Sequence, residues 1–184
     1  MNIIVKPYNS QLCYCRPDTT WEKENRDLYI PEDVDKVLWS PVIFAKVNKA
    51  GKCVSEKFVA RYYDAIGFGA LIYCNEDNIA FSSCLDHTSI LPTPTQSPEV
   101  FENVGNTLTL KIGDKSSVFE VGKEMKNALE EALCKASERI SLRIGDMVAV
   151  ELAPLEVVAE RENGATCIRA NFCENNLFDL KIIF

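Results

Sequence analysis

The alternation of hydrophobic and polar residues along this chain predicts a fold rich in β-strands. Residues 37–47 (VLWSPVIFAKV) are mostly β-branched and aromatic, which is typical of a strand. Residues 65–74 (AIGFGALIYC) carry no charge, as expected of a strand buried on both faces. Residues 107–112 alternate polar and apolar side chains and are followed by Gly113-Asp114, which predicts a hairpin over 107–121. Further strands are expected at the N-terminus and over 141–159, 165–172 and 177–184.

Two stretches follow a helical period instead. In residues 55–66, Ser55 supplies an N-cap, apolar side chains recur at helical spacing and Gly67 supplies the stop. Residues 123–137 carry one apolar stripe, best explained by core packing: Met125, Ala128, Leu129, Ala132, Leu133 and Ala136. The pattern therefore predicts an α+β fold dominated by mixed β-sheets, and 184 residues suit a single domain, 1–184.

Residues 16–36 break this pattern. They are polar, contain two prolines and mix acidic with basic side chains. This composition predicts a surface excursion with a short extended piece at 28–30.

The charge balance argues against two classes of partner. The chain has 20 Lys and Arg against 27 Asp and Glu, a net charge of -7. An acidic surface repels phosphate backbones and anionic head groups, so neither nucleic acid nor membrane is expected as a partner. The N-terminal sequence lacks the features of a signal peptide, and no stretch has the roughly 18 apolar residues of a membrane span. A soluble, cytoplasmic protein is expected.

The eight cysteines do not form a recognisable metal motif. None of them has C-x-x-C spacing, and His87 is the only histidine, so the usual zinc sets cannot be assembled. Cys13 and Cys15 would share one face of a strand, which leaves open a metal or redox pair. Reduced structural thiols are the favoured interpretation.

Weak candidates for chemistry lie after the uncharged run. Asp86 and His87 are adjacent, and histidine suits proton transfer near neutral pH. The alternative is a solvated pair in a loop rich in Pro and Thr. Cys74 and Cys84 could act as nucleophiles, or they could be inert thiols. Glu76 and Asp77 could hold a metal, although a solvated turn is the simpler interpretation of this pair.

Several segments occur in an order that resembles the fumarylacetoacetate hydrolase family. They are RPDTTWEKENRDLYIPEDVDKVLW (16–39), KFVARYYDAIGFG (57–69), EMKNALEEALCKAS (124–137) running into ISLRIGDMV (140–148), and NNLFDLKIIF (175–184). The resemblance covers about 16–184 and rests on order and spacing. It implies a mixed β-roll, usually dimeric, with a divalent metal that holds a β-dicarbonyl or 2-keto acid.

The resemblance also implies where the metal ligands would fall. The family supplies two Glu on one strand and an Asp on a later one, and Mg²⁺ favours such oxygen ligands. These three positions correspond here to Ser40, Val42 and Leu71. One hydroxyl and two hydrocarbons would replace three carboxylates, so the resemblance predicts that the metal site is lost.

Other functional positions of the family also differ. An Arg-Asp pair falls on Asn75 and Glu76, and an active-site Lys falls near Ser83. The Thr-Gly-Thr-Pro motif is Val150 to Ala153 here, and the histidine of some members' N-terminal loop has no counterpart.

Together these differences favour a non-catalytic relative without a cofactor. Such a protein would bind a small organic acid, or pair with itself or with an active paralogue. The alternative is a rebuilt active site that hydrolyses, isomerises or decarboxylates a 2-keto or β-dicarbonyl acid. A third possibility is an unrelated α+β binding module.

Overall fold

The computed structural model describes residues 1–74 and 82–184. Among these residues, eight strands form a mixed sheet, sheet A, in the order β2-β1-β10-β5-β6-β7-β3, with β11 beside β5. Its strands are β1 (Asn2–Lys6), β2 (Tyr14–Pro17), β3 (Trp21–Glu22), β5 (Lys36–Val47), β6 (Tyr63–Tyr73), β7 (Ser89–Ile90), β10 (Met147–Glu151) and β11 (Glu156–Glu160).

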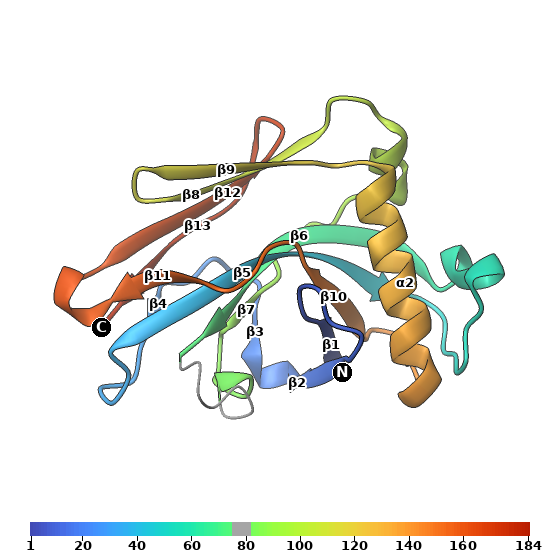
Figure 1. The fold of residues 1–184 in the computed structure, drawn as a ribbon, viewed down its shortest axis with the longest axis horizontal. Coiled ribbons are helices and arrows are strands. Elements are labelled where there is room, and N and C mark those ends of the chain that lie inside the picture. Colours follow the sequence, from blue (N-terminus) through green and yellow to red (C-terminus); the bar gives the residue numbers. More distant parts are fainter. Residues whose placement is uncertain (75–81) are drawn as a thin grey trace.

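A five-stranded sheet, sheet B, lies over β5 and β6 in Figure 1. It has the order β4-β13-β12-β8-β9, and β8 and β9 form the predicted hairpin. Its strands are β4 (Leu28–Tyr29), β8 (Thr107–Ile112), β9 (Lys115–Glu120), β12 (Thr166–Phe172) and β13 (Asn175–Ile183).

The helix α2 (Lys123–Arg139) confirms the helix predicted over 123–137. It begins after Gly122 and buries the predicted stripe, with Leu129 and Leu133 fully buried against β10 and β5. Four short 3₁₀ helices also occur in the described chain: Asp18–Thr20, Glu56–Arg61, Pro98–Glu102 and Arg161–Asn163. The α+β fold predicted from the sequence is therefore confirmed.

The two faces of sheet A bury different cores. Ile43 and Phe68 point toward α2 and sheet B, where the Phe68 ring stacks on Phe172 with centroids 5.1 Å apart. Val42 and Leu71 point the opposite way, into a second and smaller apolar cluster. We call this second side, which is turned away from α2 and sheet B, the outer face.

The helix predicted over 55–66 is wrong beyond its first residues. Only Glu56–Arg61 is helical, and β6 starts at Tyr63 and pairs with β5 over its whole length. Tyr63 and Ile66 fit a helical period, but strand pairing satisfies their backbone groups and still buries both side chains. Gly67 does not stop a helix. A Cβ there would lie 2.2 Å from the Phe44 ring, so glycine allows this ring to pack against the backbone.

The predicted surface excursion over 16–36 is also partly wrong. Leu28–Tyr29 forms the expected extended piece, but Arg16 and Thr20 are fully buried and Glu22 is 4% exposed. Arg16 lies in β2 and Glu22 in β3, so both polar side chains belong to sheet A.

In the described part of the chain, no helix is long and apolar enough to cross a membrane.

Candidate functional site

The structure brings Ser40, Val42 and Leu71 together on the outer face. Ser40 lies directly opposite Leu71 in the antiparallel β5–β6 pair, and Val42 lies two residues further along β5. Opposite residues of such a pair, and alternate residues of one strand, point to the same face. The sequence resemblance therefore maps three neighbouring side chains, all of them fully buried.

These side chains do not fit a divalent cation. The Ser40 hydroxyl donates a hydrogen bond to the Ala153 carbonyl at 2.7 Å. Val42 and Leu71 pack into the apolar cluster of the outer face, beside Ile3, Val5, Leu38, Phe44, Tyr73, Leu91, Met147 and Ala149. Mg²⁺ exchanges its waters only for hard oxygen ligands, and these positions offer one hydroxyl that is already engaged. Within residues 1–74 and 82–184, no group of three or more His, Cys, Asp or Glu side chains could hold a metal ion.

The segment Val150 to Ala153 runs beside the mapped positions on β5. Val150 and Glu151 end β10, where Glu151 lies opposite Val42 of β5. The Leu152 amide donates to the Pro41 carbonyl at 2.8 Å, and Ala153 receives the Ser40 hydrogen bond. This segment therefore continues the packing of β10 against β5.

A buried arginine lies on the outer face. The Arg16 guanidinium donates to the Thr88 carbonyl at 3.1 Å, to the Ser89 hydroxyl at 3.3 Å and to the Ile72 carbonyl at 3.0 Å. It also lies over the Tyr73 ring, 4.4 Å from the centroid. The sequence interpretation missed Arg16 because its partners lie 56 to 73 residues further along the chain.

Two tyrosines connect this arginine to a buried carboxylate. The Tyr14 and Tyr73 hydroxyls are 2.5 Å apart, and Tyr73 donates to the Glu151 carboxylate. The Tyr8 amide donates to the other Glu151 oxygen at 3.0 Å. Burial raises the pKa of the Glu151 carboxyl, although the hydrogen bond from Tyr73 opposes this shift. Burial also raises the pKa of the Tyr73 hydroxyl, so Tyr73 stays a proton donor at neutral pH.

The second candidate site is an open pocket beyond the end of β6. Its cavity of about 460 Å³ is lined by residues 27–31, by Cys74 and by 84–88. This size is in the range of small-molecule sites. The structure therefore places Cys74, Cys84, Asp86 and His87 around one cavity, while Glu76 and Asp77 lie outside the described residues.

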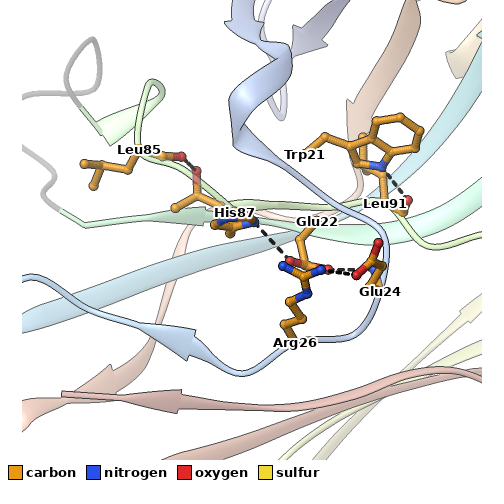
Figure 2. Close-up of polar contacts among 8 residues, drawn as sticks. Trp21, Glu22, Glu24, Arg26, Leu85, His87 and Leu91 are labelled. Atoms are coloured by element: carbon orange, nitrogen blue, oxygen red, sulfur yellow. Dashed lines mark hydrogen bonds and ion pairs between the residues drawn. The ribbon is translucent and has the colours of Figure 1, made fainter.

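His87 is the best placed of these groups for proton transfer. Its Nδ1 lies 3.0 Å from a Glu22 carboxylate oxygen, and its side chain is 53% exposed (Figure 2). The Glu24 amide donates to the other Glu22 oxygen at 2.6 Å, which fixes the carboxylate. Such a carboxylate orients an imidazole and selects its tautomer. His87 has φ of 61°, in the left-handed region, so the loop presents this ring in an uncommon backbone conformation.

The sequence interpretation did not identify Glu22 as the partner of His87. The two residues meet because β3 runs parallel to β7, with Glu22 beside Ile90. The Trp21 indole secures this pairing by donating to the Leu91 carbonyl at 2.8 Å (Figure 2). The one sequence signal for this contact was the segment TWEKE (20–24). If it forms a strand, Glu22 and Trp21 point to opposite faces.

The cysteines offer little nucleophilic chemistry at these positions. Burial raises the pKa of the Cys74 thiol to about 11, so Cys74 is protonated at neutral pH. Burial also raises the pKa of Cys13 and of Cys15, which lie on or next to β2 and form no disulfide. Cys84 is exposed beside Ser83, which is buried.

Known proteins match this chain by structure alone. Neither a family model nor a curated protein sequence gives a match. A solved structure from Yersinia pestis, assigned to the fumarylacetoacetate hydrolase family, matches with a TM-score of 0.80 at 14% identity. That match covers 99% of this chain and 92% of the other.

Two further structures agree with this match. Fumarylpyruvate hydrolase from Pseudomonas aeruginosa, in complex with Mn²⁺ and pyruvate, matches at 10% identity with a TM-score of 0.81, over 100% of this chain and 90% of the other. 2-Hydroxyhepta-2,4-diene-1,7-dioate isomerase from Mycobacterium marinum matches at 10% identity with a TM-score of 0.79, over 99% and 74%.

These neighbours define the class of fold as a mixed α+β roll. The fold is that of fumarylacetoacetate hydrolase family proteins, as the sequence resemblance implied.

Proposed function

We propose that this chain is a divergent member of the fumarylacetoacetate hydrolase family that does not use a metal at the family's position, and that it works as a binding protein or as a partner subunit. The observation that carries this proposal is the burial of Ser40, Val42 and Leu71. All three are fully buried, and none of them offers a carboxylate.

The electrostatic difference from a carboxylate site is large. A carboxylate about 4 Å from a unit positive charge is attracted by roughly 4 kcal/mol at an effective dielectric near 20, and more for a divalent ion. Three carboxylates would multiply this attraction. A serine and two hydrocarbons give almost none of it, and the waters of the ion would be lost without replacement.

Calorimetric titration with Mn²⁺ tests the proposal. The wild-type chain is expected to release no binding heat, whereas P. aeruginosa fumarylpyruvate hydrolase, solved with Mn²⁺, serves as the positive control. The variant with Ser40→Glu, Val42→Glu and Leu71→Asp should gain Mn²⁺ affinity where it folds. Micromolar binding by the wild type would overturn the proposal.

An enzyme with a rebuilt site is the second candidate, and the Glu22–His87 pair favours it. This pair borders a cavity large enough for a small molecule, and the structural neighbours include named hydrolases and an isomerase. In this mechanism His87, oriented by Glu22, would take a proton next to a carbonyl of a 2-keto or β-dicarbonyl acid. Turnover of fumarylpyruvate that resists EDTA and disappears in His87→Asn would favour this candidate.

We also propose that the pocket lined by His87 receives the ligand of the binding protein. A small organic acid would use the His87 imidazole as its hydrogen-bond donor, because the described lining residues contain no Lys or Arg. Asp27 and Asp86 lie on the same lining, so acids of low charge should bind better than dicarboxylates. A cytoplasmic location and a dimer, formed with itself or with an active paralogue, complete the proposal and follow from the sequence resemblance and composition.

A further inference from the structure

A positively charged side chain of the protein, Arg16, lies beside the mapped ligand positions. Leu71 lies between two strands on the outer face, opposite Ser40 of β5 and opposite Ser89 of β7. The Arg16 guanidinium reaches the Ser89 hydroxyl, and it lies over Tyr73, two residues along β6 from Leu71. The arginine therefore lies beside the position where the family would place its metal-binding Asp.

The guanidinium is satisfied by neutral groups. Its hydrogen bonds go to the Thr88 carbonyl and hydroxyl, the Ser89 hydroxyl, the Ile72 carbonyl and, at 3.4 Å, the Tyr14 hydroxyl. The side chain is fully buried. A cation that is removed from water in this way needs such acceptors and a nearby anion.

The acidic group linked to this guanidinium is Glu151, which lies on the other side of the mapped ligands. Glu151 is opposite Val42 in the β10–β5 pair and is 5% exposed. The Tyr73 hydroxyl donates to its carboxylate while the Tyr73 ring faces the guanidinium. A cation beside Leu71 and an acidic side chain beside Val42 are thus connected through one tyrosine.

We infer that Arg16 is this chain's substitute for the divalent cation, and that the outer face is a cation site permanently filled by its own guanidinium. This inference rests on the proposed function, because it requires that no metal binds at these positions. It gives the Arg16 charge a structural role at the position where related structures would hold a soluble ion. The guanidinium contacts β6, β7 and the segment before β7, and it is linked through Tyr73 to β10.

A filled cation site has a specific consequence when its cation is removed. Arg16→Ala leaves a void of guanidinium shape, lined by the same acceptors and close to Glu151. Free guanidinium has the charge and the planar donors to re-enter this void. Binding to the folded state then raises the midpoint of thermal unfolding, Tm, by an amount that grows with the logarithm of ligand concentration above the dissociation constant.

The experiment measures Tm of Arg16→Ala with increasing millimolar guanidinium chloride, far below denaturing concentrations. Arg16→Ala should unfold about 10 °C below the wild type. Guanidinium should restore part of this loss, whereas urea, its neutral isostere, and sodium chloride should not. Arg161→Ala is the matched control, because Arg161 also donates to two carbonyls but is one-third exposed, so guanidinium should not restore its Tm.

Other outcomes separate this inference from the proposed function. Equal effects of guanidinium and urea on Arg16→Ala would overturn the inference alone. Recovery of Arg16→Ala with Mn²⁺ would overturn both, because it would show metal binding at this face. If Arg16→Ala does not fold, Arg16→Lys and Arg16→Met decide: the inference requires a higher Tm for Lys, and equal values would overturn it.

Discussion

The outer face around Leu71 and the pocket around His87 use the same strand in opposite ways. Leu71 and Tyr73 lie inside sheet A, where the Arg16 and Glu151 charges are removed from solvent and hydrogen-bonded. One residue later, Cys74 lines a cavity whose His87 side chain is half exposed. Titratable groups alone therefore do not mark a functional site. On the outer face they hold strands together, while the open pocket leaves an imidazole available to a ligand.

The largest expected difference between the two regions is in packing. Leu71→Ala removes a fully buried side chain and should lower the free energy of unfolding by about 2–5 kcal/mol. Leu85→Ala makes the same chemical change in the pocket wall, where the side chain is half-buried, and should cost about 1 kcal/mol. Urea denaturation of both variants checks this. Equal losses would show that the pocket wall is as tightly packed as the outer face.

The next largest expected effect is a change in the free energy of unfolding with pH that is due to Glu151. Burial raises the pKa of this carboxyl in the folded state, so its protonated form is favoured by folding. Its contribution to stability is therefore fully present below the pKa of the unfolded chain and is lost as pH rises through the folded pKa. The free energy of unfolding of the wild type, relative to Glu151→Gln, should fall as pH rises from about 4 through the pKa of the folded-state carboxyl.

Urea denaturation across this range measures the Glu151 effect. The exposed Glu162, changed to Gln, provides the control and should show no comparable trend. A wild-type advantage over Glu151→Gln that grows with pH would contradict the prediction. In that case, the positive charge of Arg16 would stabilise the carboxylate more than burial destabilises it.

The smallest effect is expected in the pocket. His87→Asn removes the contact of the imidazole Nδ1 with Glu22 and keeps a residue that tolerates the left-handed backbone. Because the imidazole is half exposed, the free energy of unfolding should change by at most about 1 kcal/mol. The same denaturation experiment measures it. A loss as large as that of Leu71→Ala would show that His87 is structural, and the contrast between the two regions would disappear.

The spacing of apolar residues was sufficient to predict those helices and strands whose buried face can be identified within the segment itself. The stripe of α2 and the alternation of β8 each define a buried face within a few residues, and the predicted helix and the β8–β9 hairpin are both confirmed. The sequence predicts a helix over residues 62–66 because the spacing of their apolar side chains fits the period of a helix as well as that of a strand. Only pairing with β5, which lies earlier in the chain, decides in favour of the strand.

The chemistry of the outer face was predicted only in part. The sequence placed Ser40, Val42 and Leu71 by resemblance, and the structure shows that they are neighbours. Arg16 and Glu151 could not be connected by any local pattern, because the residues of this network come from β2, β6, β7 and β10. A charged residue at the end of the apolar run MVAVE was the one local sign of Glu151.

The position of β1 between β2 and β10 in sheet A has a consequence for how the protein is made. β1 pairs in parallel with β10, and the Asn2 amide donates to Asp146, 144 residues later. The apolar segment Ile3–Val5 therefore leaves the ribosome long before its partner strand exists, with only β2 available to cover it. Parallel pairing over such a separation is slow, and until it forms, apolar side chains remain exposed to other chains. Chaperone binding to the nascent chain should accordingly persist until β10 is synthesised.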